Sequence, residues 1–197
     1  MIDIRIKATA CAISIVAAGM STSVHALKMD GSAGVNLSHT DNAALTSTGE
    51  TNDTIATVSL RGRVSEEEGS LTGNLMASVR HLDYLENTFG EETYLALGAN
   101  AVWEQIRNRL TWSLRNHYDQ VLRNTLAANT PDNTEDTNAF SLSATATLPV
   151  APRHTLSITP SFSDFYYDAS NNDNQQVGLS ASWNYLLNPT VTLSLNS

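Results

Sequence analysis

The chain has 197 residues, of which 41% are hydrophobic and 16% are charged, and its formal net charge is −9 at pH 7. An acidic surface repels phosphate backbones, so we expect no nucleic-acid partner. The one cysteine, Cys11, cannot form an intrachain disulfide. The charged fraction is below the ~25% of ordinary soluble domains. Ser, Thr and Asn are abundant in place of charged residues, as expected where many side chains line a water-filled interior.

Residues 1–26 have the three parts of a secretory signal peptide. A weakly basic start is followed by an apolar run at 8–20 and by small residues before a cleavage position at Ala26. The run is shorter than the ~20 residues of a transmembrane helix, so a membrane anchor is the less favoured alternative. We expect export by a cleaved signal and a mature domain at 27–197, which keeps nine basic and nineteen acidic residues.

Apolar and polar residues alternate along most of the mature chain, which is the pattern of strands with two unlike faces. Leu110, Trp112 and Leu114, for example, alternate with Thr111 and Ser113. The pattern predicts nine strands, at 34–40, 54–64, 71–80, 94–103, 108–122, 140–148, 154–167, 175–187 and 190–196. Beyond the third of these the alternation slips, because Leu82 and Tyr84 fall on the polar face. The slip predicts a bulge or the exit of this strand from a membrane.

The connections between the predicted strands alternate in length along the chain. Those at 41–51, 86–92, 123–138 and 168–174 are long and rich in Asn, Asp, Thr and Glu; those at 66–69, 104–108, 149–153 and 187–190 are short. Up-and-down outer-membrane barrels have short periplasmic turns and longer external loops. The alternation therefore predicts a barrel of hairpins whose four short turns all lie on the periplasmic side.

Aromatic residues are concentrated near both ends of the predicted strands. Such rings are typical of the girdles at the two membrane interfaces, although aromatics also cap the cores of ordinary sheets. The residues of the predicted girdle are Trp103, Trp112, Trp183, Tyr185, Tyr84, Tyr94, Tyr118, Tyr166 and Tyr167.

Five arginines fall on the predicted inward faces. Rings of charge inside a barrel select the solutes that pass, so these residues predict a basic strip that favours an anionic solute or polymer. The alternative is that they fill the lumen as partners in salt bridges. The five residues are Arg61, Arg63, Arg80, Arg109 and Arg115.

The chain contains several short motifs: Asp41-Asn42, Glu50, Asn52-Asp53-Thr54-Ile55, Trp103 and Trp112 around a tight turn, Asp119-Gln120-Val121-Leu122, Thr130-Pro131-Asp132-Asn133 and Asn138-Ala139-Phe140. These motifs resemble a family of proteobacterial outer-membrane β-barrel proteins associated with the PEP-CTERM/exosortase system. The resemblance covers most of residues 30–197 and implies a non-enzymatic role at the cell surface, in exopolysaccharide export or anchoring. The family has no established catalytic residues to carry over.

The sequence contains no motif that predicts catalysis, a cofactor or a metal. It lacks a Gly-x-Ser-x-Gly elbow, a phosphate-binding loop and a His-Glu-x-x-His site. The carboxylates of Asp132, Glu135 and Asp136 have the chemistry for calcium, but a solvated loop is the favoured interpretation. We therefore expect no enzyme activity and no bound cofactor.

Together these features predict an all-β fold of antiparallel up-and-down hairpins that forms part of a transmembrane β-barrel. We expect a porin-like or exopolysaccharide-associated protein of the cell outer membrane, in contact with lipid and lipopolysaccharide. The alternative from another class is a secreted or surface-attached β-sandwich or adhesin that binds glycans through its loops. Because residues 190–196 end the chain within an apparent strand, we expect the whole barrel to contain further hairpins.

Overall fold

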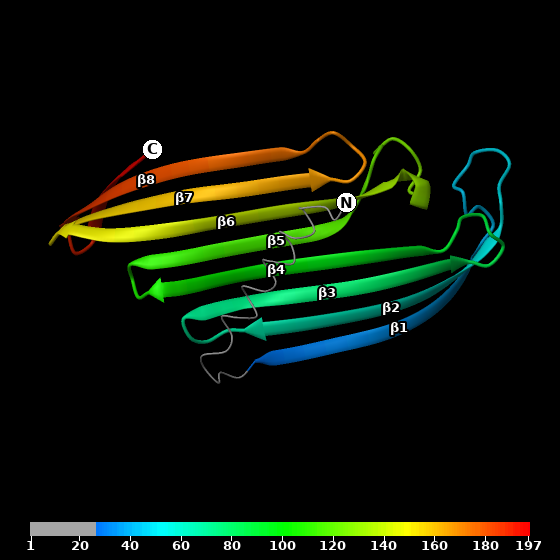
Figure 1. The fold of residues 1–197 in the computed structure, drawn as a ribbon, viewed down its shortest axis with the longest axis horizontal. Helices are drawn as coiled ribbons and strands as arrows, with labels where there is room; N and C mark the ends of the chain where they lie inside the picture. The colour runs from blue at the N-terminus through cyan, green and yellow to red at the C-terminus, as the bar shows by residue number, and fades with distance from the viewer. Residues whose placement is uncertain (1–26) are drawn as a thin grey trace, which may run out of the picture.

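The protein folds as one antiparallel sheet in which every strand pairs with its neighbour in the chain (Figure 1). The computed structural model describes residues 27–197, so the predicted signal peptide lies outside the described residues. The nine strands are β1 (Lys28–Thr40), β2 (Asp53–Glu66), β3 (Leu71–Tyr84), β4 (Glu92–Ile106), β5 (Leu110–Leu122), β6 (Thr134–Ala151), β7 (His154–Tyr167), β8 (Asn174–Asn188) and β9 (Val191–Asn196). The predicted all-β, up-and-down arrangement of nine strands is confirmed.

The alternation of long and short connections is also confirmed. Residues 41–52, 85–91, 123–133 and 168–173 form the long loops, at one end of the sheet, and residues 67–70, 107–109, 152–153 and 189–190 form the short turns, at the other (Figure 1). The third long loop is shorter than predicted, because β6 begins at Thr134 and includes a polar segment whose composition resembles a loop. Asn and Thr there pair with β5 as ordinary strand residues.

The short turns contain the left-handed backbone conformations that tight reversals need. Gly69, in the turn after β2, has φ +93°, and Asn108, in the turn after β4, has φ +56°. The Asn108 N–H donates a hydrogen bond of 2.7 Å to the Glu104 side chain, which fixes that turn. The register shifts of the sheet lie beside three of these short turns, after Glu104, Pro149 and Leu186.

The hydrogen-bond register gives the sheet one apolar and one polar face, since residues directly opposite each other in antiparallel strands share a face. Across three strands, for example, Leu60 is opposite Val79, and Val79 is opposite Leu95. The predicted bulge after Arg80 is wrong: β3 pairs without a register shift with β2 up to Tyr84 and with β4 up to Leu82. Leu82 and Tyr84 therefore lie on the polar face.

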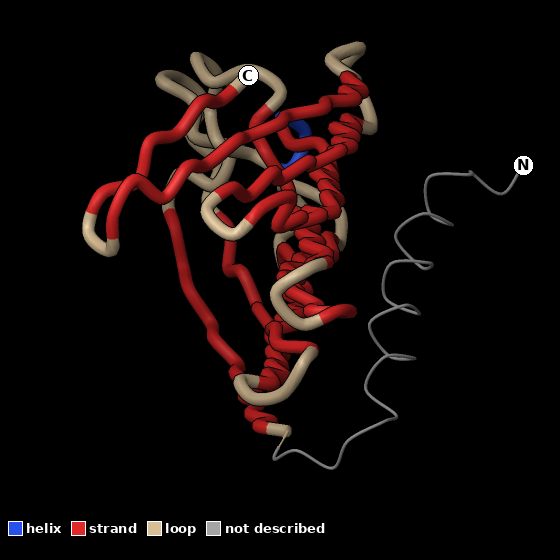
Figure 2. Tube along the Cα trace, turned by 90° about the vertical axis from the view of Figure 1, so that its left-hand side faces the viewer, coloured by secondary structure: helices blue, strands red, loops and turns tan. Residues whose placement is uncertain are grey.

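A single layer of strands has no interior of its own. Among the hydrophobic residues described, only Tyr84 is buried. The strands are long and the sheet curves (Figures 1 and 2), but it stays open, with β1 and β9 as its two edges. A closed barrel is therefore not seen. Within residues 27–197 no helix is long and apolar enough to cross a membrane.

Candidate functional site

The most distinctive surface of the protein is an apolar band that crosses the apolar face of eight strands. None of its positions carries Ser, Thr, Asn, Gln or a charged residue. In six of the strands the band is nine residues long, as from Leu71 to Val79. The register places the segments side by side across the sheet. The band consists of every second residue within 29–37, 56–64, 71–79, 95–103, 110–114, 140–148, 156–162 and 177–185.

Nothing in the described part of the chain covers this band. Val35 is 84% exposed, Leu179 is 73% exposed and Leu60, in the middle of its strand, is 56% exposed. Isolated exposed aliphatic residues are ordinary on soluble proteins, whereas a continuous exposed patch marks a surface that contacts another apolar phase. The band therefore needs an apolar partner.

On the loop side, the band ends at a line of polar side chains that bond to one another on the same face. His39 contacts Thr54 at 3.1 Å, from Nδ1 to Oγ1, and His81 contacts Thr93 in the same way at 2.9 Å. Farther along, Asn116 Nδ2 donates to Asn138 Oδ1 at 2.7 Å. We call this line the polar border. It continues through Tyr118, Gln120 and Asp136. The Tyr118 hydroxyl donates to the Asp136 carboxylate at 2.6 Å, and the Gln120 side-chain amide donates to it at 2.8 Å.

The nine aromatic residues of the predicted girdle divide between the two faces. Trp103 and Trp112 are opposite each other at the turn end of the apolar face. Trp183 and Tyr185 lie at the same end, stacked with His154, whose ring centroid is 4.7 Å from that of Tyr185. Tyr118 and Tyr166 lie at the loop end of the apolar face, whereas Tyr84, Tyr94 and Tyr167 lie on the polar face.

Four of the five predicted basic residues share the polar face: Arg61, Arg63, Arg80 and Arg115. We call these four the basic strip. Arg109 instead lies in the turn before β5 and is not part of a strand. The strip arginines form no salt bridge in residues 27–197, where the ion pairs are Lys28–Glu67 and His117–Asp119. Within residues 27–197, therefore, no salt bridge supports the alternative interpretation of these arginines as salt-bridged lumen filler.

The strip arginines also contact neutral groups, and Arg63 lies near the carboxylates of Asp30 and Glu67. Arg115 Nε donates to Asn100 Oδ1 at 3.1 Å, and the Arg80 guanidinium lies 5.2 Å from the centre of the Tyr94 ring. Asp30 is the cross-strand neighbour of Arg63. Ser and Thr occupy much of the rest of this face, so most of its surface can exchange hydrogen bonds with water or a polar solute.

Two long loops are fixed by buried carboxylates, a feature that sequence reasoning missed. The Asp53 carboxylate, which is fully buried, accepts hydrogen bonds from the backbone N–H groups of Glu86, at 3.0 Å, and Thr88, at 2.9 Å. Glu135 is 6% exposed and accepts from the N–H groups of Ala169, at 3.1 Å, and Ser170, at 2.8 Å. Both acids lie at the start of a strand, as its first or second residue, and hold the loop that follows the next strand.

Burial acts to raise the pKa of Asp53, but the hydrogen bonds from Glu86 and Thr88 outweigh it and hold the pKa well below its usual range. Asp53 is the first residue of β2, where the chain leaves the long loop. Because the folded-state pKa is lowered, this carboxylate stabilises the fold fully above its unfolded pKa of ~3.9. The contribution is lost only as the pH falls through the lower folded-state value.

The acidic residues considered for calcium have separate partners. Glu135 holds the loop after β7, and Asp136 accepts from Tyr118 and Gln120 in the polar border. In residues 27–197 no group of three or more His, Cys, Asp or Glu side chains is arranged to hold a metal ion. The comparison with known proteins gives no further guide, because no protein-family model, curated protein or solved structure matches the chain.

Proposed function

We propose that the protein is a non-enzymatic wall segment of an outer-membrane β-barrel, with the apolar band facing lipid and the polar face lining a water-filled lumen. The observation that carries this proposal is the band, a continuous and uncovered apolar surface on a single sheet. Only helices and closed barrels satisfy all backbone polar groups within a bilayer. The proposal therefore requires the edges of β1 and β9 to be paired, by further strands or by other copies of the chain.

The length of the band fits a bilayer. At ~3.3 Å per residue, nine residues extend for ~26–30 Å along a strand. A strand tilted by ~40° then contributes ~20–23 Å of apolar height, close to the ~25 Å apolar band of outer-membrane barrels. Such a barrel crosses the membrane with strands of ~9–11 residues. The additional residues of β2 and β6 extend beyond the band at both ends, with the longer extension on the loop side.

The two margins of the band fit the two interfaces of a membrane. Trp103, Trp112 and Trp183 lie at the turn end, where indole rings can sit among headgroups. The polar border lies at the loop end, where its histidine, amide and tyrosine groups would meet lipopolysaccharide and water. By analogy with known barrels, the short turns are periplasmic and the long loops external.

We expect opposite accessibilities at two adjacent positions, Leu114 in the band and Arg115 on the polar face. Each residue is replaced by cysteine in a Cys11→Ala background, labelled with a nitroxide and refolded in lipid vesicles. The label at 114 should collide mainly with oxygen, which dissolves in lipid, and the label at 115 mainly with a water-soluble nickel chelate. Equal accessibilities, or the reverse ranking, would contradict the proposal.

The second candidate is a secreted or surface-attached β-sandwich or adhesin. It is favoured by the long polar loops gathered at one end of the sheet (Figure 1), and it requires a second layer over the apolar band. Fractionation decides between the two: the barrel is recovered with outer membranes and migrates differently on gels before and after boiling. A soluble, detergent-free monomer would favour the adhesin.

The basic strip supports a lumen that prefers anions. We expect the double change Arg61→Gln and Arg63→Gln to shift the reversal potential in planar bilayers toward cation preference, since it removes two charges that form no salt bridge within residues 27–197. Arg109→Gln, in the turn before β5, is the matched control and should leave selectivity almost unchanged. An unaltered reversal potential in the double variant, with channels still forming, would exclude the basic strip as the selectivity element.

The link to exopolysaccharide rests on the sequence resemblance alone. A porin-like barrel and a polymer-associated barrel share the same wall and differ in what occupies the lumen. Deleting the gene and measuring secreted polysaccharide separates them: reduced export favours the polymer role, and unchanged export favours a porin for small solutes.

A further inference from the structure

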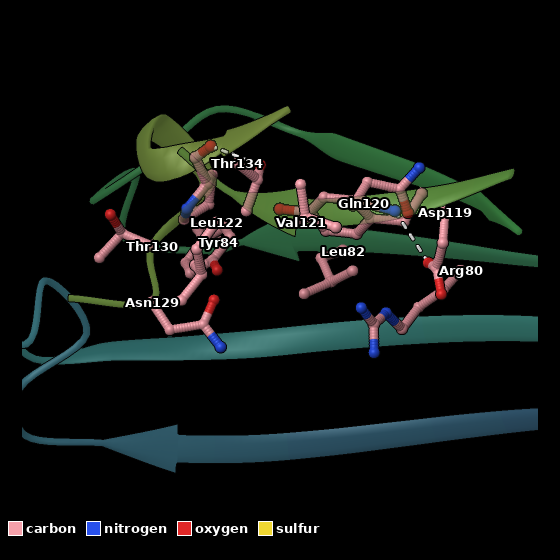
Figure 3. A pocket seen from close by; sticks show the side chains of 12 residues that line it. Arg80, Leu82, Tyr84, Asp119, Gln120, Val121, Leu122, Asn129, Thr130 and Thr134 are labelled. Carbon is pink, nitrogen blue, oxygen red and sulfur yellow. Dashed lines mark hydrogen bonds between the residues drawn. The ribbon is translucent and has the colours of Figure 1, made fainter. Parts of the chain in front are cut away.

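A cavity of about 340 Å³ lies on the polar face at the loop end of the sheet (Figure 3). Strands β3, β4 and β5 supply one side of the lining, and the long loop 123–133 supplies the other through Asn129, Thr130 and Pro131. This volume is at the low end of the range for small-molecule sites, ~300–1,000 Å³. A cavity of this volume suits a ligand with one ring rather than a chain of several linked rings.

The loop that forms one wall is held in place by Asn133. Its side-chain amide donates to the carbonyl oxygens of Asn124 and Ala128, each at 2.9 Å, and its Oδ1 accepts from the Asn124 N–H at 3.0 Å. The hydroxyl of Thr134 donates to the Pro131 carbonyl at 2.8 Å. The cavity is therefore bounded by an ordered wall, and its shape exists before a ligand arrives.

Within residues 27–197, the Arg80 guanidinium, which lines the cavity, has no carboxylate at salt-bridge distance. The Arg80 guanidinium lies over the Tyr94 ring, with 5.2 Å from its Cζ to the ring centre, in a cation–π contact. The nearby Asp119 carboxylate is engaged elsewhere: it accepts from the Gln120 N–H at 2.8 Å and lies 3.8 Å from His117 Nε2. A guanidinium fixed in this way is suited to a carboxylate of a ligand.

The rest of the lining combines apolar and hydrogen-bonding surfaces. Leu82, Val121 and Leu122 lie between the Arg80–Asp119 end and the Asn129–Thr130 end (Figure 3). A hydroxylated ring matches this arrangement, because its C–H groups pack on aliphatic side chains while its hydroxyls bond to carboxylate, amide and hydroxyl groups. We propose that the cavity binds one acidic sugar, a uronic acid, with its carboxylate on Arg80. The proposal rests on the proposed function, since it takes the polar face to line the entrance of the lumen.

Binding of glucuronate to the full chain folded in detergent, followed by isothermal titration calorimetry, tests this site. We expect saturable binding of glucuronate and at least tenfold weaker binding of glucose, which lacks the carboxylate, and of acetate, which lacks the hydroxyls. Arg80→Gln should weaken glucuronate binding at least tenfold. Arg115→Gln, which removes an arginine from the same face outside the cavity, should leave it within twofold.

Other outcomes overturn the proposal. Equal binding of glucose and glucuronate, equal loss in the two arginine variants, or preference for a zwitterion such as alanine would each exclude a uronic acid site on Arg80.

A short oligoglucuronate that binds more tightly than the monomer identifies a polymer terminus as the source of the ligand; equal affinities identify a free sugar acid. Migration that changes on boiling, measured on the same samples, shows whether the barrel itself has failed, independently of the cavity.

Discussion

Leu179→Arg is expected to destabilise the protein in lipid vesicles by about 2 kcal/mol, because it moves a guanidinium into the hydrocarbon region. Leu179 is 73% exposed in the isolated sheet. In water, a substitution at so exposed a position would alter stability by no more than about 0.5 kcal/mol. Urea unfolding of the vesicle-bound protein, followed by tryptophan fluorescence, measures the difference.

Ser180→Arg is the matched control for this substitution. Ser180 is the next residue of β8, lies on the polar face opposite Thr159 and is exposed. The same side chain there should enter the aqueous lumen, with a change in stability within about 0.5 kcal/mol. Equal effects at the two positions, in either direction, would show that the two faces of the sheet are not exposed to different solvents.

Glu135→Ala should release the loop after β7 without unfolding the sheet. The substitution leaves the N–H groups of Ala169 and Ser170 without their acceptor, and losing hydrogen bonds to a buried charged group costs about 1–3 kcal/mol. Local opening then becomes roughly 10- to 100-fold more frequent. Hydrogen–deuterium exchange should show that loss of protection at 169 and 170, while amides in the middle of β7 stay protected.

Asp132→Ala provides the comparison, because Asp132 is an exposed carboxylate three residues earlier in the chain. Its removal changes the net charge by the same amount and should leave exchange at 169 and 170 unaltered. Protection lost over all of β7 in the Glu135 variant would mean that this carboxylate supports the sheet as a whole. Protection unchanged in both variants would mean that the two hydrogen bonds do not order the loop.

Much of the fold was predictable because local pattern determines it. A strand exposes alternate residues to opposite sides, so the order of residues such as Leu110 to Leu114 is enough to predict a strand and its two faces. The lengths of the connections are also a local property, because each is set by where one strand ends and the next begins. Prediction failed in two places where the local residue pattern does not match the structure. The polar first residues of β6 resemble a loop but form a strand. Leu82 and Tyr84 suggest a bulge, which the continuous register of β3 excludes.

The candidate site was predictable only in part. Four of the five arginines share the expected face, but Arg109 lies in a turn. The alternation of residues is the same whether a strand begins at 108 or at 110, so the pattern does not show on which side of the boundary Arg109 lies. Asp53 and Glu135 resemble solvated loop acids in sequence. No local signal distinguishes them, since their partners lie 33 to 35 residues away in the chain.

The sequence by itself determined the strands, the two kinds of connection and the residues that share a face within one strand. The tertiary structure decided how these segments align. Hydrogen-bond register makes eight separate apolar stretches into one band and joins His81 to Thr93 in its border, and loop packing places Asn129 and Thr130 beside strands β3 to β5 to complete the cavity that Arg80 also lines. The physical reason is distance along the chain. Alternation acts between adjacent residues, whereas register and loop packing depend on contacts between residues that only folding brings together.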